Sequence, residues 1–130
     1  MTVKNDEIKY QQLVDVTAKL TLTIAAMEQA LEKNKRLTDY YVAHIADENS
    51  AENIKILAED QTYIQNKITE VQEMIADNKR VIDGGVEMVK TAMFVNEMND
   101  EDWANVIEDN VHVATGTEKI TNYYAGLPEV

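Results

Sequence analysis

The chain has 130 residues, with 24 acidic and 12 basic side chains, a net charge of −12, and no cysteine. This length fits one domain, and 45% hydrophobic with 28% charged residues is typical of a folded chain. The absence of cysteine excludes disulfides, cysteine nucleophiles and Cys-ligated zinc or iron–sulfur centres. The acidity argues against direct binding of nucleic acid or of an anionic membrane, because both need clustered Lys or Arg.

The N-terminal sequence does not resemble a targeting signal. Lys4, Asp6 and Glu7 stand where a signal peptide needs an apolar region. The longest uncharged apolar stretch, residues 20–27, is much shorter than the ~20 residues of a membrane-spanning helix. We therefore expect a cytoplasmic protein (in the host cytoplasm if the chain is viral) with no membrane partner.

Glycine and proline are absent from the first 83 residues. They occur only afterwards, at Gly84, Gly85, Gly116, Gly126 and Pro128. β-Sandwiches and barrels need a turn every 8–12 residues, and doubly wound folds need Gly-rich crossover turns. The distribution therefore predicts an all-α fold.

Apolar residues recur at spacings of three and four along two successive segments, which is the heptad pattern of packed, supercoiled helices. This pattern predicts a long antiparallel hairpin, coiled-coil-like, with helices at about 6–48 and 51–83. Ser50 is the predicted cap of the second helix, and Gly84 ends it. The basic cluster at 33–36 fits a break followed by a Thr38 cap, or a continuous helix, and we favour continuity. The residues expected at an oligomer or partner interface are Leu13, Leu20, Ile24, Met27, Leu31, Ile64, Ile68, Val71 and Ile75.

Residues 84–130 are predicted to form a short acidic helical region packed on the hairpin. They include nine acidic and two basic residues, and so −7 of the net charge. Asn99 or Asp100, and then Thr117, are the predicted helix caps, whereas residues 111–113 fit a helix end or a short strand. We expect a homo-oligomer, because two long seams carry more apolar surface than this short region can cover. Four polar positions in the seams would fix the helix register and the oligomeric state: Thr17, Asn34, Gln61 and Asn78.

The sequence offers little for catalysis. Ser50 is the only serine, and neither His44 nor His112 lies near it in a motif. Asp109 and His112 form the only acid-x-x-His pair, whereas a di-metal helical bundle needs two Glu-x-x-His motifs. We therefore expect no catalytic residues, no metal site and no cofactor.

One pattern points to an enzyme. Glu70-x-x-Glu73 is followed by Glu97-x-x-Asp100, and carboxylate pairs on two helices can hold Mg²⁺ against a triphosphate. These four residues resemble the motif of all-α nucleotide pyrophosphohydrolases of the MazG-like and dimeric dUTPase-like families. The resemblance implies a Mg²⁺-dependent pyrophosphohydrolase as one alternative. In those families the second pair lies inside a helix, whereas residues 97–100 here form a polar cluster typical of a helix break.

A second alternative follows from the acidic C-terminal stretch, which contains no Lys or Arg. Its residues are Glu97, Asp100, Glu101, Asp102, Trp103, Glu108 and Asp109. Such a surface can occupy a basic nucleic-acid-binding groove of a partner and inhibit it, or it can simply be a solvated helix face. The tyrosine pairs Tyr40–Tyr41 and Tyr123–Tyr124 fit either interface aromatics or packed core side chains.

The sequence therefore favours a non-enzymatic protein–protein interaction protein that acts through a helical-bundle surface. It would be an assembly factor, scaffold or inhibitor, with itself and another protein, one with a basic surface, as partners. Its small size and acidity are typical of an accessory protein of bacterial or phage origin.

Overall fold

The computed structural model describes residues 2–130, with side chains from residue 5 onwards, and the described part consists of helices joined by short turns, without a strand. The all-α prediction is confirmed. None of the described helices combines the length and apolarity that a membrane crossing needs. The five helices are α1 (Thr2–Ala43), α2 (Ser50–Asp83), α3 (Gly85–Val95), α4 (Asp100–Gly116) and α5 (Glu118–Gly126).

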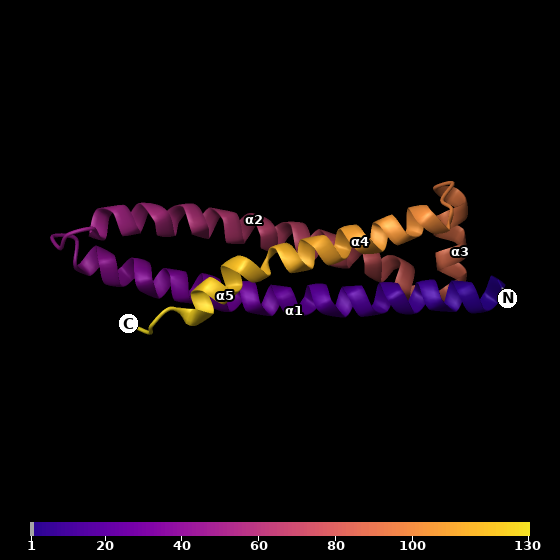
Figure 1. Ribbon diagram of the computed structural model, residues 1–130, viewed down its shortest axis with the longest axis horizontal. Coiled ribbons are helices and arrows are strands. Elements are labelled where there is room, and N and C mark those ends of the chain that lie inside the picture. The colour runs from indigo at the N-terminus through magenta and orange to yellow at the C-terminus, as the bar shows by residue number, and fades with distance from the viewer. Residues whose placement is uncertain (1) are drawn as a thin grey trace.

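The two long helices, α1 and α2, lie antiparallel along the whole molecule (Figure 1). α1 is continuous through residues 34–39, as favoured, but it ends at Ala43 rather than near residue 48. The connection reverses at Asn49, whose φ of 69° is a left-handed conformation that asparagine tolerates well. Asn49 therefore occupies the cap position, and the prediction of Ser50 as the cap is wrong, because Ser50 is already the first, buried, helical residue.

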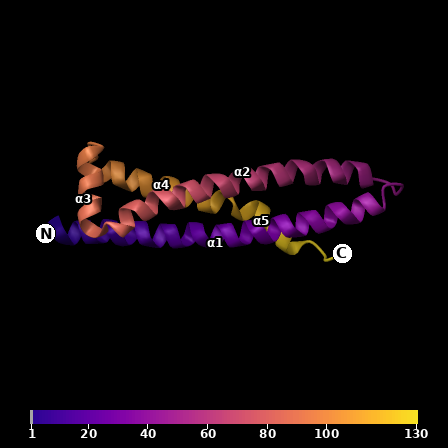
Figure 2. The same cartoon turned by 180° about the vertical axis from the view of Figure 1, so that it is seen from behind.

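The C-terminal region, residues 84–130, returns along this pair of helices. α3 stands across the end of the molecule that holds the N-terminus, and α4 and α5 then run back beside α1 and α2 (Figure 1; Figure 2). Residues 111–113 lie inside α4, so the helical alternative holds for them. The turn at residues 44–49 extends beyond the end of α5, so the α1–α2 pair alone forms this tip of the rod (Figure 1; Figure 2).

The residues predicted at an oligomer or partner interface lie inside a single chain. Leu20, Met27, Ile64 and Val71 are fully buried in one core cluster, and Leu13 is buried in a second one. Ile24, Leu31, Ile68 and Ile75 are partly buried and pack against the first cluster. The physical reason is that α4 and α5 follow one another along the groove between α1 and α2 and close its open side. Self-association stays a prediction. Because these residues are buried within one chain, it would have to use a different surface of the molecule.

Two polar layers cross the core and join three helices each. In the first, the Asn78 amide of α2 donates to the Thr17 hydroxyl of α1 (3.1 Å) and to Asn110 Oδ1 of α4 (2.9 Å). In the second, the Asn34 amide of α1 donates to the Tyr124 hydroxyl of α5 (2.8 Å), which donates to Asp60 of α2 (2.7 Å). Three of the predicted polar seam residues thus hold the C-terminal helices in place, because buried polar groups need specific partners.

The helix ends follow local chemistry. Gly85 has a φ of 71°, which glycine adopts without strain, and it turns the chain from α2 into α3. Asn99 and Asp102 form a reciprocal capping box at the start of α4, with the Asn99 cap as predicted. Thr117 occupies the N-cap position of α5, as predicted, but its hydroxyl donates back to the Ala114 carbonyl (2.8 Å) and makes no capping hydrogen bond.

Candidate protein-binding surface

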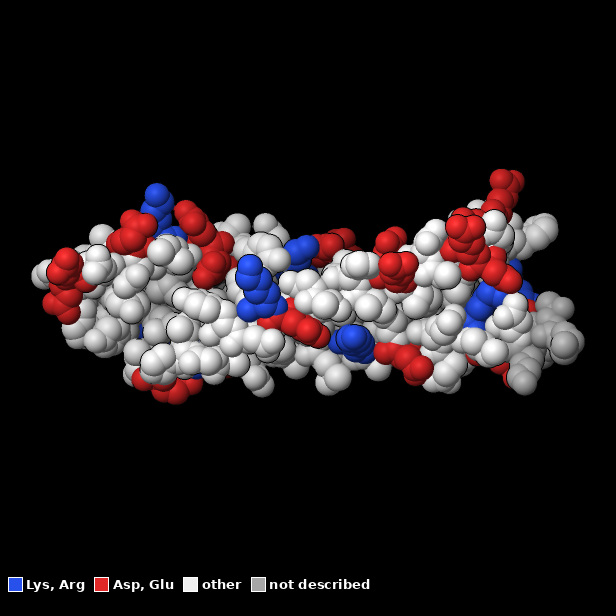
Figure 3. Space-filling model, in the orientation of Figure 1, with Lys and Arg blue, Asp and Glu red and all other residues white. Residues whose placement is uncertain are grey.

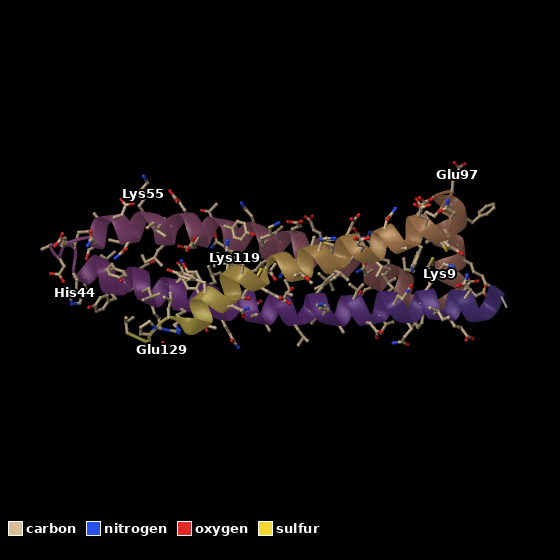
Figure 4. All side chains as sticks on the ribbon, in the orientation of Figure 1. Lys9, His44, Lys55, Glu97, Lys119 and Glu129 are labelled. Carbon is tan, nitrogen blue, oxygen red and sulfur yellow. The ribbon has the colours of Figure 1, made fainter. Side chains whose placement is uncertain are left out.

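The most exposed large apolar side chain of the described residues stands where α3 meets α4. Phe94 is 84% exposed, and its neighbour Val95 is also well exposed. Because α3 lies across the rod, this end of α3 projects from the molecule, with Glu97 at its outermost point (Figure 4). We define residues 94–102 as the α3–α4 corner.

The backbone of the corner is tightly turned. Glu97 has a φ of 53°, a conformation uncommon for residues other than glycine and asparagine. The Met98 N–H donates to the Met93 carbonyl (2.8 Å), and the partly buried Met98 side chain packs against the second core cluster. The corner is therefore attached to the core directly after the two exposed apolar residues, which limits how freely they can move.

Carboxylates follow Phe94 along the corner. Glu97, Glu101 and Asp102 are exposed, and the sequence has no Lys or Arg between Lys90 and Lys119. Figure 3 shows acidic side chains gathered over this projecting end. The corner therefore combines an exposed aromatic ring with negative potential, which is an arrangement suited to a basic partner.

Asp100 is exposed, but it also forms an ion pair that holds α4 against α1. Its carboxylate pairs with Lys9 of α1 at 2.8 Å, and the Lys9 side chain is only 7% exposed. The hydrogen bond and charge of Lys9 hold the pKa of Asp100 below its ordinary value. This pair fixes the first turn of α4 on α1, so Asp100 acts chiefly as an anchor for the corner.

Trp103 does not belong to the acidic surface, which corrects the expectation from the sequence. Its side chain is 5% exposed and packs in the core cluster of Leu13, Val16 and Val89. The cause is helical periodicity, because Trp103, Asn110 and Ala114 share the buried face of α4. The predicted acidic residues all lie on the outside.

The acidic surface continues along α4 beyond the corner. Glu108 and Asp109 follow Glu101 and Asp102 by seven residues, so they share an exposed face of the helix. Glu108 also lies 3.3 Å from the ring of His112, a neighbour one turn later. From residue 101 to residue 109, the four carboxylates form an acidic row about 12 Å long at about 1.5 Å per residue.

The carboxylate pairs that resemble the pyrophosphohydrolase motif do not come together. Glu70 and Glu73 are exposed on α2, where Glu70 pairs with Lys67 at 3.0 Å. Glu97 lies in the turn after α3, and Asp100 is the first residue of α4. Within residues 2–130, no group of three or more histidines, aspartates or glutamates is arranged to hold a metal ion.

Phe94 was not among the candidate interface residues predicted from the sequence. A signal was present, since Met93, Phe94 and Val95 are three successive apolar residues, and a helix of 3.6 residues per turn cannot direct all three into a core. Met93 packs inside, and the other two are left in solvent.

Comparisons of the chain with models of protein families, with curated proteins and with solved structures gave no match.

Proposed function

We propose that this protein is a non-enzymatic interaction protein that binds another protein through the α3–α4 corner. The observation that carries the proposal is the 84% exposure of Phe94 beside the carboxylates of Glu97 and Glu101. The partner would offer an apolar pocket for the ring, bordered by Lys or Arg. The protein would serve as an assembly factor, scaffold or inhibitor.

The two parts of the corner would contribute differently to binding. Burying an exposed phenylalanine side chain yields about 1.5–3 kcal/mol, and aromatic anchors of this kind commonly dominate interface energies. The surrounding carboxylates would mainly accelerate association and select basic partners, because exposed charges contribute more to steering than to affinity. We therefore expect Phe94 to govern the dissociation rate and the acidic residues to govern the salt dependence.

A second candidate function is inhibition of a nucleic-acid-binding protein. It is supported by the acidic row on α4, in which Glu101, Asp102, Glu108 and Asp109 share an exposed face. Such a row could occupy a basic groove in place of the phosphate backbone. In that case the charge of the row, rather than Phe94, would supply most of the affinity.

Comparative capture from a host lysate, read by mass spectrometry, tests both functions. Under the main proposal, the wild type and a Leu22→Ser control retain the same partner, whereas Phe94→Ser loses it. Leu22 is a fair control because it is 72% exposed on α1. Equal capture by Phe94→Ser and the wild type would contradict the proposal.

Salt separates the two candidates. At roughly 0.5 M salt, screening confines charge interactions to a few ångströms, so an acidic inhibitor would release its partner. Charge reversal at Glu101 and Glu108 would have the same effect at low salt. A complex anchored by Phe94 would weaken but persist under both conditions.

A further inference from the structure

An apolar groove lies on the other half of the rod, between α2 and α5. Its volume is about 460 Å³, and its walls are formed mainly by Ile56 and Tyr63 of α2 and by Ile120 and Tyr123 of α5. Tyr123 is 57% exposed, and Ile56 and Tyr63 are nearly as exposed. An exposed apolar groove on a soluble helical rod marks a surface that another molecule can cover.

The groove is already formed in the single chain. Ile56 and Tyr63 are seven residues apart, as are Gly116 and Tyr123, so each wall extends over two helical turns. Asp60, which also lines the groove, is held by the hydrogen bond from Tyr124 (2.7 Å). Little conformational entropy is therefore lost when the groove is filled.

The charges of the groove favour a second copy of this chain as the occupant. The molecule has a net charge of −12, so two copies repel one another over most of their surfaces. The residues lining the groove include one carboxylate, Asp60 on the α2 wall, and one ammonium group, Lys119 on the α4–α5 wall. A two-fold axis that runs along the groove sets each wall against the opposite wall of the other copy, so that Lys119 faces the Asp60 side.

We propose that two copies of this chain associate through the groove between α2 and α5, with Tyr63 and Tyr123 of each copy packed against the other. The interface is neutral and apolar where the rest of the molecule is acidic. It is also separate from the α3–α4 corner, since Lys119 lies near the middle of the rod and Glu97 at one end (Figure 4). A dimer of this kind leaves both corners accessible, and two linked corners raise the avidity for a multivalent partner.

Sedimentation velocity over a concentration series tests the association. The wild type sediments as a dimer that dissociates on dilution, and the Tyr63→Ser/Tyr123→Ser double variant sediments as a monomer at every concentration. Leu22→Ser, which removes a similarly exposed apolar side chain from α1, stays dimeric. Far-UV circular dichroism of each variant verifies that the helices are retained.

A second variant distinguishes this specific interface from non-specific hydrophobic association. A Cβ built at Gly116 meets no other atom within 4 Å, so Gly116→Trp fits the backbone while its ring fills the groove. It adds apolar surface, yet it raises the dimer Kd at least tenfold if the groove is the interface. Lys119→Glu does the same by setting like charges against each other.

Three results would overturn the proposal. A wild-type chain that is monomeric over the whole series has no such interface. A dimer that survives both the double tyrosine variant and Gly116→Trp uses another surface. A monomer whose groove is instead covered by an unrelated protein, shown by loss of that protein in Gly116→Trp, replaces the second copy with a different occupant.

Discussion

The Asn78 side chain of α2 donates a hydrogen bond to Asn110 of α4 over 2.9 Å, although the two residues lie 32 positions apart in the chain. The same amide reaches Thr17 of α1, so three helices meet in one buried layer. An α4 helix shifted along the rod would leave these polar groups buried without partners. The layer therefore fixes the register in which α4 closes the core.

Replacing Asn110 by alanine tests this layer. The change removes the acceptor of Asn78 and also the bond from Asn110 Nδ2 to the Val106 carbonyl (2.8 Å). We expect a loss of about 1–3 kcal/mol in the free energy of unfolding, because a buried donor loses its partner. Urea unfolding followed by circular dichroism measures it. Asn122→Ala, at an exposed position of α5, is the control, expected within about 0.5 kcal/mol of the wild type.

Trp103 is expected to act as a core residue. Trp103→Ala should cost about 3–5 kcal/mol of unfolding free energy, the usual range for removing a large buried aromatic side chain. Since Trp103 is the only tryptophan, its fluorescence reports directly on the docking of α4. We expect blue-shifted emission that resists aqueous quenchers and shifts to the red on unfolding. Emission like that of tryptophan in water would contradict the burial.

The raised pKa of Tyr124 predicts that the protein loses stability at alkaline pH. Burial raises the pKa of its hydroxyl above the ordinary value of 10, and the adjacent Asp60 carboxylate raises it further. A pKa raised by folding means that this stabilisation is complete below pH 10 and is lost as the pH rises beyond it. Tyr124→Phe should therefore be less stable than the wild type near pH 8, with a smaller further loss at about pH 11. Urea midpoints at both pH values measure the difference.

The control for this prediction is Tyr123→Phe. Tyr123 is 57% exposed, so its substitution should leave the alkaline loss of the wild type unchanged. Equal alkaline losses in the wild type and in both variants would show that Tyr124 ionises normally and would exclude its burial beside Asp60.

The lowered pKa of Asp100 predicts that the protein loses stability in acid. Lys9 lowers the pKa of Asp100 through a hydrogen bond and its charge, so folding favours the ionised carboxylate. This stabilisation is present above the ordinary pKa of 3.8 and is lost as the pH falls through the lowered pKa. Asp100→Asn should be less stable than the wild type at neutral pH and should lose less on acidification.

Thermal unfolding between about pH 5 and pH 2 measures this effect, with Glu101→Gln as the exposed neighbour for comparison. The effect is expected to be small, because Asp100 is exposed and solvent screens the pair. If Asp100→Asn and Glu101→Gln show the same pH profile, then the Lys9 contact does not hold the first turn of α4.

The long helices were predictable because their signals are local and repeated. The heptad spacing from Ile54 to Ile82 and the absence of glycine before Gly84 each favour helix at every turn. The Asn99 cap was equally readable, since a capping box involves residues only three apart. Ser50 was misassigned because it stands next to Asn49, and only the backbone reversal decides which of them precedes the helix.

The candidate site was only partly predictable. The acidic residues of α4 are exposed as a group, but Trp103 among them is buried, because a helix directs its side chains to all sides in turn. Phe94 is 84% exposed because it lies at the end of α3 that points away from the rod. No local sequence pattern specifies the angle at which a short helix leaves a turn.

The sequence by itself determined that the chain is helical, where its long helices run, and which stripes of side chains have to be buried. Tertiary structure decided what buries them. α4 and α5 close the seam of α1 and α2 within one chain, and the layers of Asn78 and Asn34 hold them there. The physical reason is that periodicity specifies a face to be covered but not its occupant. That choice depends on contacts between residues far apart in the chain.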